Sequence, residues 1–360
     1  MRQKFLVAMS GGVDSSVAAH LLLKMGYAVD GVYMRTWHGD DGLGNCPWRD
    51  DLENAKAAAA HLAVPFRVES LIDCYGRCVV QPLLQGYARG ETPNPDMLCN
   101  RWIKFGALLD LATREGYAGL ATGHYCRLAN GNDGPWLLVG CDKKKDQSYF
   151  LAQVRREALP WMAFPIGHLV KDEVRRVARK IGLPNADRKD SQGVCFLGGK
   201  VSMREFLLRH IGKRPGSVVD RTGRHIGTHN GVFLHTLGQR RGLAIPSNHD
   251  NEHYVVVAKD MANNQLTIAL ATENDPTLSM ATAELHSINF LCAPLDGSHV
   301  LTVRVRYRDP PTMATLRFFP KGRAHVAFSE PQRALAPGQH LAFYHGERLL
   351  GGGIYHQPGK

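Results

Sequence analysis

The chain has 360 residues, of which 44% are hydrophobic and 21% are charged, as expected for a globular protein of two or three domains. Its 8 cysteines are dispersed and form neither a secreted disulfide framework nor a paired Cys-x-x-Cys zinc site. The net charge of +11 predicts a polyanionic partner, nucleic acid before membrane, and no apolar run is long enough for a membrane span.

The first 200 residues alternate between strand-like and helix-like patterns. Met1-Arg-Gln-Lys4 leads directly into an apolar run, so we expect no signal peptide and a cytoplasmic protein. Such alternation is typical of an α/β domain with a doubly wound parallel sheet, which binds ligands at the carboxyl ends of its strands. The predicted strands are 5–8, 28–34, 65–69, 118–122 and 136–139, and the predicted helices are 15–25, 50–62, 97–115 and 170–182.

The remaining residues indicate two smaller domains. From 201 to 275 the pattern is mixed, with a helix predicted at 202–211, glycine-rich turns and a short strand near 254–257. From 276 to 360, short alternating strands between proline and glycine turns predict a small antiparallel β-barrel or sandwich. Its predicted strands are 299–307, 314–319, 324–328 and 340–344.

The stretch Ser10-Gly-Gly-Val-Asp-Ser15 joins the first predicted strand to the first predicted helix. A strand that turns through glycines into a helix leaves unpaired N–H groups beside the positive end of the helix dipole, which together cradle an anion. The lysine of G-x-x-x-x-G-K-[ST], which reaches the outer phosphates, is missing. The loop therefore favours release of intact pyrophosphate, although an ordinary glycine turn is the alternative. The pattern resembles the PP-loop ATP pyrophosphatases, which activate a carbonyl by adenylation.

Cys99 follows the rigid segment Pro93-Asn-Pro-Asp96. We expect Asp96 to cap the helix that begins after it, which would place Cys99 in the first helical turn. A helix N-terminus lowers the pKa of a thiol and favours the nucleophilic thiolate. The alternative is that Cys99 is only a small buried hydrophobic residue.

Cys195 lies in a second cysteine loop, Arg188-Lys-Asp-Ser-Gln-Gly-Val-Cys195-Phe-Leu-Gly. Basic neighbours stabilise a thiolate, and the flanking glycines let a large substrate approach the backbone. Two candidate thiols in separate loops suggest exchange chemistry, in which one sulfur attacks and the other resolves. Cys74 and Cys78, four residues apart on one helix face, are interpreted as core residues.

Three further stretches could contact a ligand, although each is also compatible with an ordinary structural role. Ala121-Thr-Gly-His124-Tyr125 ends a strand with glycine and histidine at the expected ligand edge. Lys143-Lys-Lys-Asp-Gln147 is a basic run that a solvated surface would also explain. Arg304-Val-Arg-Tyr307-Arg places an aromatic ring among arginines, a pattern that suits phosphates and bases.

Taken together and in this order, the motifs resemble the bacterial tRNA-specific 2-thiouridylase (MnmA) family, over residues from about 5 to 355. The paired cysteine loops are far more specific than the PP-loop, which many enzymes share. The departures are minor, with Gln192 and Val194 standing where Thr or Ser and Ile are expected. The other matching motifs are Lys145-Asp-Gln-Ser-Tyr-Phe-Leu151, His235-Thr-Leu-Gly-Gln-Arg-Arg-Gly242, Leu335-Ala-Pro-Gly-Gln339 and Gly351-Gly-Gly353.

The resemblance implies an ATP-dependent sulfurtransferase (tRNA-uridine 2-sulfurtransferase) that inserts sulfur at C2 of the wobble uridine, position 34, in tRNAs for lysine, glutamate and glutamine. It implies a PP-loop catalytic domain over 1–200, a central tRNA-contacting domain over 201–275 and a C-terminal barrel over 276–360. The C2 oxygen would attack the α-phosphate of ATP, with Mg²⁺ bridging phosphates near Asp14, and AMP and pyrophosphate would be products. Cys195 would carry a persulfide from a cysteine desulfurase or relay protein. Cys99 would attack that persulfide or resolve a base-bound intermediate, leaving a Cys99–Cys195 disulfide to be reduced.

The resemblance also assigns binding residues. Asn94, Pro95 and Asp96 would hold the target base, which must be flipped out of its stack. The residues matched to ATP binding are Ala8, Met9, Ser10, Gly11, Gly12, Val13, Asp14, Ser15, Met34 and Gly123. Those matched to tRNA contacts are His124, Lys145, Asp146, Gln147, Arg306, Tyr307 and Gln339.

Other classes fit the motifs less well. A PP-loop amide or amino transferase for a small metabolite needs no paired cysteine loops and no basic β-domain. A 2-thiocytidine-type enzyme carries two Cys-x-x-Cys pairs for an iron–sulfur cluster, which this sequence lacks. A non-catalytic RNA-binding protein has no use for the thiols or the pyrophosphate loop. We expect a monomer without a resident metal site, and the sequence leaves open whether Asp96, Cys99 and Cys195 hold a labile iron–sulfur cluster.

Overall fold

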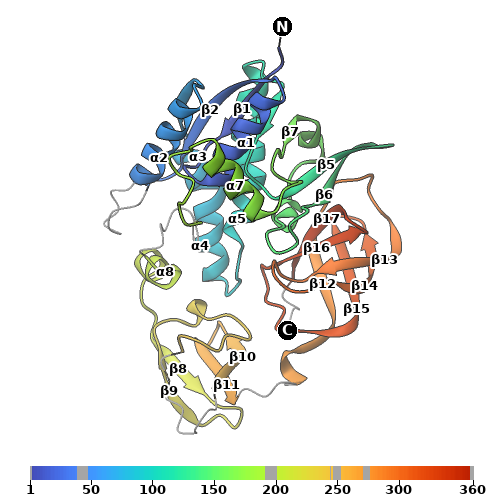
Figure 1. Cartoon of the computed structure of the whole chain (residues 1–360). Helices are drawn as coiled ribbons and strands as arrows, with labels where there is room; N and C mark the ends of the chain where they lie inside the picture. Colours follow the sequence, from blue (N-terminus) through green and yellow to red (C-terminus); the bar gives the residue numbers. More distant parts are fainter. Residues whose placement is uncertain are drawn as a thin grey trace.

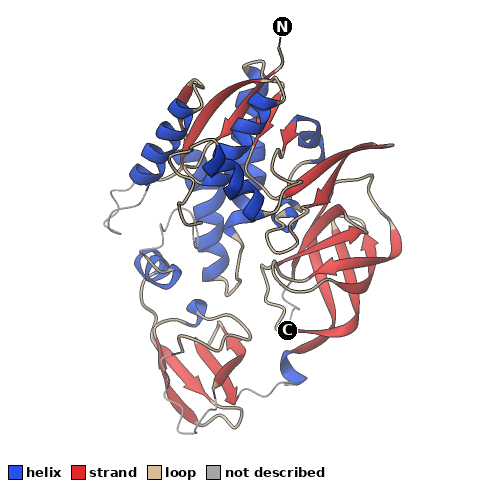
Figure 2. Cartoon of the chain, viewed as in Figure 1, coloured by secondary structure: helices blue, strands red, loops and turns tan. Residues whose placement is uncertain are grey.

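The computed structural model describes residues 2–38, 48–190, 201–243, 245, 253–270 and 276–356. It shows an N-terminal α/β unit, a small central β unit below it and a C-terminal β-barrel beside it (Figure 1). Helices are concentrated in the first unit, whereas the other two consist mainly of strands (Figure 2). No helix among the described residues is both long and apolar enough to cross a membrane.

The N-terminal unit is built on a five-stranded parallel sheet with the order β3-β2-β1-β4-β7. The chain moves outward from β1 to β2 and β3, then crosses back to β4 and β7 on the other side. This confirms the predicted doubly wound sheet, whose switch point lies between β1 and β4. The strands are β1 (Lys4–Ala8), β2 (Ala28–Arg35), β3 (Phe66–Ser70), β4 (Gly119–Ala121) and β7 (Met162–Ala163).

Helices surround this sheet. The apolar stripe of α1, which includes Val17 and Leu22, is buried against β1 and β2, and this burial fixes the helix on the sheet. The helices are α1 (Val13–Lys24), α2 (Trp48–His61), α3 (Ile72–Tyr75), η1 (Gly76–Val80), α4 (Gln81–Ala88), α5 (Pro95–Leu98), η2 (Cys99–Leu108), α6 (Leu109–Arg114), η3 (Ser148–Leu151), η4 (Arg156–Trp161) and α7 (Lys171–Lys180).

One predicted strand of the parallel sheet was placed in the wrong sheet. Residues 136–139 belong to β6 (Gly134–Val139), which forms an antiparallel hairpin with β5 (Cys126–Gly131). The hairpin joins the C-terminal sheet through pairing of Leu138 with Arg348 (Figure 1). An apolar run of this length is compatible with a buried strand in either sheet, and the sequence pattern does not specify its partner. The short strand β7 takes the expected place in the parallel sheet.

The C-terminal unit is a closed antiparallel barrel of the strands β12, β15, β14, β13, β16 and β17, because β12 also pairs with β17. This confirms the predicted barrel. Its strands are β12 (Ser279–Phe290), β13 (Gly297–Arg304), β14 (Thr312–Phe319), β15 (Arg323–Arg333), β16 (His340–His345) and β17 (Arg348–Tyr355), and η7 (Pro276–Leu278) precedes them.

The central unit has four strands in the order β10-β11-β8-β9. The predicted helix at 202–211 is confirmed as α8 (Met203–Ile211), which Ser202 caps by accepting a hydrogen bond from the Glu205 amide. The domain boundaries expected near 200 and 275 fall within 191–200 and 271–275, outside the described residues. The remaining elements are β8 (Gly216–Val219), β9 (His225–His229), η6 (Val232–Leu234), β10 (Tyr254–Asp260) and β11 (Gln265–Leu270).

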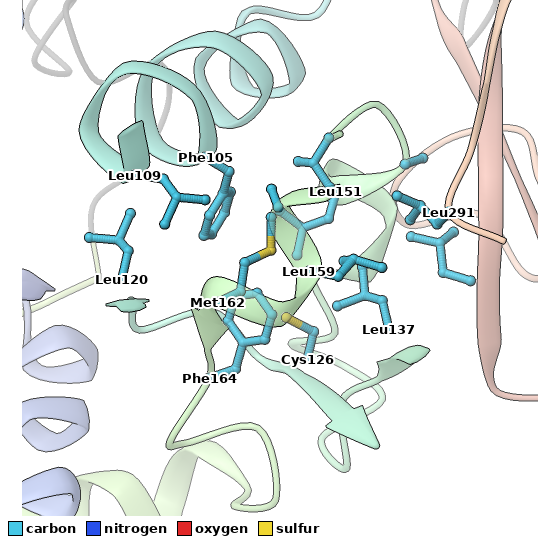
Figure 3. Packing of buried hydrophobic residues seen from close by; sticks show 14 of the residues in the cluster. Phe105, Leu109, Leu120, Cys126, Leu137, Leu151, Leu159, Met162, Phe164 and Leu291 are labelled. Atoms are coloured by element: carbon cyan, nitrogen blue, oxygen red, sulfur yellow. The ribbon is translucent and has the colours of Figure 1, made fainter. Parts of the chain in front are cut away.

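The N-terminal unit and the barrel share one hydrophobic core. Cys126 and Leu137 from the hairpin pack in a single cluster with Phe105 of η2 and with Leu291 and Leu349 of the barrel (Figure 3). Burial of apolar surface across such a junction disfavours movement of one unit against the other. The barrel is therefore fixed relative to the face of the parallel sheet at which ligands are expected.

Candidate active site

The PP-loop lies at the switch point of the parallel sheet, directly after β1. Gly12 occupies the N-cap of α1, and the Ser10 amide donates to Ser15 Oγ at 3.2 Å. Gly11 has φ +80°, and a Cβ there would approach the Asp51 carbonyl oxygen to 2.2 Å, so only glycine fits. The sequence folds into a tight turn that exposes backbone N–H groups at the start of a helix, which is an anion-binding geometry.

Residues from two neighbouring strands complete this edge. Met34 lies near the carboxyl end of β2, next to β1, and packs against both core clusters that border the site. Gly123 follows β4, and a Cβ at this position would lie 2.7 Å from the Ser15 amide nitrogen. The structure thus brings together the three segments matched to ATP binding, namely 8–15, Met34 and Gly123.

A network of charged side chains surrounds Asp14 of the PP-loop. Lys171 Nζ, at the start of α7, lies 2.8 and 2.9 Å from the two Asp14 carboxylate oxygens and 2.7 Å from Asp190 Oδ1. Lys145 Nζ reaches Asp190 Oδ2 at 2.7 Å, and Arg175 pairs with Asp190 Oδ1 at 3.1 Å. Lys145, Lys171 and Arg175 therefore place three cationic groups around the Asp14 and Asp190 carboxylates beside the anion cradle, and the nearby Asp142 carboxylate accepts from the Lys171 amide at 2.9 Å.

Protonation states in this network follow from its ion pairs. Partial burial by itself would raise the pKa of Asp190, but hydrogen bonds from Lys145 and Lys171 lower it to about 2. Burial and the Asp14 carboxylate, to which Tyr125 donates a 2.8 Å hydrogen bond, raise the pKa of Tyr125 well above its usual range. Asp190 stays ionised and Tyr125 stays a neutral donor at neutral pH.

The Gly11 carbonyl is held from the segment that precedes the Cys195 loop. Asn185 Nδ2 and Arg188 Nη1 donate to it at 2.9 and 3.0 Å, and Arg188 also pairs with Asp51. These contacts fix the PP-loop from the side opposite its amides. Residues 191–200, with Cys195 and the departures at Gln192 and Val194, lie outside the described residues.

Among the residues that the structure describes, those near the PP-loop do not form a protein cage for Mg²⁺. Both carboxylate oxygens of Asp14 are engaged by Lys171, and Tyr125 also donates to one of them. In the described part of the chain there is no group of three or more His, Cys, Asp or Glu side chains suited to a metal ion. The positive charge next to the loop is therefore that of the Lys171 ammonium. The Asp14 carboxylate is paired with this lysine and is not arranged with other carboxylates as ligands for a hard cation.

The helix that carries Cys99 begins earlier than predicted and has a different cap. Asn94, not Asp96, is the N-cap residue, and its side-chain oxygen accepts from the amides of Asp96 and Met97 at 3.0 and 3.3 Å. Pro95 takes the first helical position, where its missing N–H costs nothing. Asp96 therefore does not cap the helix. Cys99 is the first residue of the wider helix η2, and its exposed fraction is 8%.

Asp96, Asn100 and Lys104 recur every four residues and so share one face of this helix. Burial raises the pKa of Asp96, and the nearby Lys104 ammonium partly opposes this rise. Lys104 Nζ donates to Asn100 Oδ1 at 3.0 Å. This face provides a carboxyl group, an amide and an ammonium close to Cys99.

His124 borders the same face. Its ring lies 5.8 Å from that of Phe105, and its Nδ1 is 2.7 Å from Thr122 Oγ1. Burial, with Lys104 as a second cause, keeps the pKa of His124 well below its usual range, so the imidazole is neutral at pH 7. The His124 side chain is buried against Phe105 and Phe164. It could contact tRNA only if these packed side chains moved apart.

A second chain of contacts connects this face to the barrel. Asn100 Nδ2 donates to the Phe150 carbonyl at 3.1 Å, and the Phe150 ring lies 4.3 Å from that of Tyr307. Tyr307 follows β13, so aromatic surface from the barrel reaches the N-terminal unit. The neighbouring Arg306 pairs with Asp309 at 3.3 Å and also donates to the Arg333 carbonyl.

Other residues matched to tRNA contacts are occupied within the protein. Asp146 is 2% exposed, and it accepts from the Gly140 amide at 2.9 Å and pairs with Arg304 at 2.8 Å. Gln147 Oε1 accepts from the Tyr125 amide at 3.0 Å. Gln339 Nε2 donates to the Thr92 carbonyl at 2.9 Å. These contacts occupy the polar groups of Asp146, Gln147 and Gln339. Two of them, Asp146 with Arg304 and Gln339 with Thr92, connect the N-terminal unit to the barrel.

Sequence reasoning did not identify Lys171, Asp190 or Lys104 as site residues. Lys171 was read only as part of a helix, because nothing in a single sequence places the start of α7 beside the PP-loop. The recurrence of Asp96, Asn100 and Lys104 at four-residue intervals was a usable signal for a shared helix face. Cys74 and Cys78 lie on α3 and η1 and pack at the edge of the Cys99 cluster, as their spacing suggested.

Comparison with protein families covers almost the whole chain. A family model described as the tRNA methyl transferase HUP domain matches residues 3–199. Models described as the tRNA methyl transferase PRC-barrel domain and the aminomethyltransferase beta-barrel domain match residues 204–270 and 281–355.

Relatives of similar length are named tRNA-specific 2-thiouridylase MnmA. The protein from Akkermansia muciniphila is 44% identical over 353 residues, covering 98% of each chain. That from Halorhodospira halophila is 42% identical, covering 98% of this chain and 93% of its own. That from Klebsiella pneumoniae (strain MGH 78578) is 41% identical, covering 99% of this chain and 97% of its own.

Proposed function

The chain belongs to the tRNA-specific 2-thiouridylase family, and on that premise we propose how its own residues carry out ATP-dependent 2-thiolation of the wobble uridine, position 34, of tRNA. The single observation that carries the proposal is the proximity of two sites. Met34 packs against the cluster that contains Cys99 and also against the cluster that Ala8, at the start of the PP-loop, borders, so an activated base and a sulfur donor can meet there.

The first half-reaction takes place at the PP-loop. The amides of residues 10–15 and the start of α1 hold the phosphates of ATP, with Met34 and Gly123 beside the adenosine. Lys171 and Lys145 exchange their carboxylate partners for phosphate oxygens and stabilise the charge that builds up as pyrophosphate leaves. The C2 oxygen of uridine bonds to the α-phosphorus while the bond to the β-phosphate bridging oxygen breaks. Mg²⁺ bound with ATP would supply charge stabilisation at the phosphates, and Asp14 would be the PP-loop carboxylate near it.

The target base lies on the face formed by Asp96, Asn100 and Lys104. Asn94 Oδ1 is committed to the helix cap, so its amide nitrogen is the group left for the base. The Asp96 carboxyl group, whose pKa is raised by burial, can hydrogen-bond to the flipped-out uracil, and Pro95 keeps the turn rigid. The base must leave its stack because C2 is inaccessible within a stacked anticodon.

The second half-reaction transfers sulfur. Cys195 carries the persulfide, and its terminal sulfur replaces the adenylated oxygen at C2, so that AMP leaves. Cys99 attacks Cys195 Sγ and releases sulfide to the base, or it resolves a base-bound intermediate. Both routes form a Cys99–Cys195 disulfide, which an external thiol reductant must reduce before the next turnover.

The partners follow from this chemistry. The tRNAs for lysine, glutamate and glutamine are the proposed substrates, bound across His124, Lys145–Gln147, Arg306, Tyr307 and Gln339. A cysteine desulfurase or a sulfur-relay protein supplies the persulfide. We propose that the enzyme acts as a monomer in the cytoplasm, where tRNA and ATP are present.

The direct test is a product analysis. Purified protein, ATP, a persulfide-generating desulfurase and unmodified tRNA should yield 2-thiouridine at position 34, detected by mass spectrometry of nucleosides. AMP and pyrophosphate should accumulate in equal amounts. ADP as the nucleotide product, or thiolation at another position, would refute the proposal. Omission of tRNA is the control for uncoupled hydrolysis of ATP.

Binding of tRNA should depend strongly on salt, because the chain is basic and the proposed contacts are spread over distant segments. Affinity should fall roughly tenfold or more between 50 and 200 mM salt, and Arg306→Gln should weaken binding and reduce the log–log slope by about 0.9. Filter binding or anisotropy at four salt concentrations measures both effects. Arg114→Gln, at an exposed arginine outside the proposed contacts, is the matched control. An unchanged slope for Arg306→Gln would remove this residue from the interface.

A further inference from the structure

The segment Gly90–Thr92, which leads into the Cys99 helix, is held by both of the other structural units. On the barrel side, the Thr92 amide donates to the Pro337 carbonyl at 2.7 Å, and Gln339 Nε2 donates to the Thr92 carbonyl at 2.9 Å. Gly338 has φ +83°, and a Cβ there would approach the Thr92 amide to 3.0 Å, so the two backbones are in close contact. The barrel thus contacts the segment at the main-chain groups of Thr92.

The central unit holds the same segment from the other side. Thr92 Oγ1 lies 3.2 Å from Thr236 Oγ1, and Lys259 Nζ on β10 donates to the Gly90 carbonyl at 2.8 Å. Gly90 has φ +83°, and a Cβ there would lie 2.6 Å from Met261 Sδ. The segment therefore lies between two domains that are distant from it in sequence.

Lys259 is an unusual residue to use for such a contact. It borders a cavity of about 50 Å³ that is also lined by Gly90, Leu237, Met261 and Pro337, with contributions from all three units. Among the described residues no carboxylate forms an ion pair with it, and burial lowers its pKa from 10.5 to about 8. A partly desolvated ammonium without a counter-ion is costly for the fold. The contact between Lys259 and the Gly90 carbonyl is therefore not explained by a gain in the stability of the fold.

The position of the contact points to the reaction. Asn94, the cap of the Cys99 helix, lies only four positions after Gly90, and Pro93 stiffens the connection. Pro93 also packs closely on α4, where a Cβ at Gly86 would approach Pro93 Cγ to 2.3 Å. A displacement at Gly90 is therefore transmitted to Asn94, Asp96 and Cys99 rather than absorbed by a flexible loop.

We propose that Lys259 is a positioning residue for the sulfur-transfer reaction, in which it holds the Gly90 carbonyl so that the docked central unit sets the geometry of the base-binding turn and Cys99. The inference rests on the proposed function, because the turn matters only if it binds the target base. Lys259 contacts neither substrate nor thiol in this account. It acts through the backbone of residues 90–94.

The test is Lys259→Met, which keeps an unbranched apolar stem but removes the terminal ammonium donor. With saturating tRNA and ATP, kcat for 2-thiouridine formation should fall about tenfold or more, since small misplacements of reacting groups have effects of this size. The KM for ATP and the Kd for tRNA should change by less than about twofold, because ATP binds at the PP-loop and most of the tRNA affinity comes from phosphate contacts outside the base-binding turn. Lys213→Met, at an exposed lysine of the same unit, controls for the loss of one positive charge.

A second measurement does not depend on activity. Hydrogen exchange followed by mass spectrometry should show faster exchange of the amides in residues 92–99 of Lys259→Met, with other peptides unchanged. The unfolding midpoint should stay within about 4 °C of the wild type, because the lost hydrogen bond is offset by removal of a desolvated charge.

The outcomes distinguish the proposed function of the protein from the positioning role of Lys259. If the wild-type protein itself fails to thiolate tRNA, the proposed function is wrong, and the exchange data alone still report whether Lys259 fixes the turn. If the wild type is active and Lys259→Met matches it in kcat and in exchange at 92–99, the positioning role is wrong. A general loss of protection with a large drop in the unfolding midpoint would also overturn it, since Lys259 would then serve the fold.

Discussion

Cys99→Ser should accept sulfur on Cys195 and adenylate tRNA, yet fail to complete thiolation, with turnover reduced by roughly a thousandfold or more. Serine is nearly isosteric with cysteine, and Cys99 is buried in the core beside Met34, so the fold should be retained. The hydroxyl cannot attack a persulfide or form a disulfide at neutral pH. Radiolabelled sulfur on the protein and 2-thiouridine in the tRNA distinguish the two stages.

Cys195→Ser provides the complementary result. It should lose the ability to accept sulfur from a desulfurase, while tRNA-dependent pyrophosphate release continues. Non-reducing mass analysis after a single turnover should find a Cys99–Cys195 disulfide only in the wild type. Cys78→Ser, in the same hydrophobic cluster as Cys99, is the matched control and should thiolate normally. Wild-type rates for both loop variants would rule out the mechanism.

Lys171→Met should reduce tRNA-dependent pyrophosphate release by about a hundredfold or more, which is typical for loss of one preorganised charge at a reacting group. The Lys171 ammonium lies within 2.9 Å of both Asp14 oxygens and 2.7 Å from Asp190, beside the PP-loop amides. Without this ammonium, the Asp14 and Asp190 carboxylates face the position where the phosphates must bind. They would repel ATP, and the charge of the leaving pyrophosphate would lose its stabilising partner.

Asp14→Ala should give a similar loss of pyrophosphate release, because Lys171 then loses the carboxylate that orients it toward the loop. Binding of tRNA should stay nearly unchanged in both variants. Lys180→Met, the same change at the exposed end of α7, is the control and should keep wild-type pyrophosphate release. Full activity of Lys171→Met would show that this lysine only neutralises Asp14 and Asp190.

The two halves of the site have different mechanical supports. The PP-loop is fixed within the N-terminal unit, by α1, α7 and the segment ending at Asp190. The Cys99 helix depends on the other units, through Thr92 and Gly90 on one side and Phe150 and Tyr307 on the other. Adenylation should therefore be less sensitive than sulfur transfer to substitutions in the central unit and the barrel.

Local sequence determined the features that depend on neighbouring residues. The glycines and the apolar run around Ser10 specify a strand–turn–helix anion cradle, because backbone conformation and the helix dipole are local properties. The alternation of elements up to residue 200 specifies a doubly wound sheet, and its strand order then places residues 8–15 and Gly123 at one switch point. The paired cysteine loops pointed to sulfur exchange without any knowledge of their arrangement.

Tertiary structure decided the features that depend on which distant surfaces meet. The apolar run at 136–139 fits either sheet, and only packing against Leu291 and Leu349 directs it to the barrel. Asn94 rather than Asp96 became the helix cap, since both can accept amide hydrogen bonds and the helix began two residues earlier, at Pro95. Lys171 and Lys259 acquire their partners 157 and 169 residues away, and contacts across such separations leave no periodic signal in one sequence.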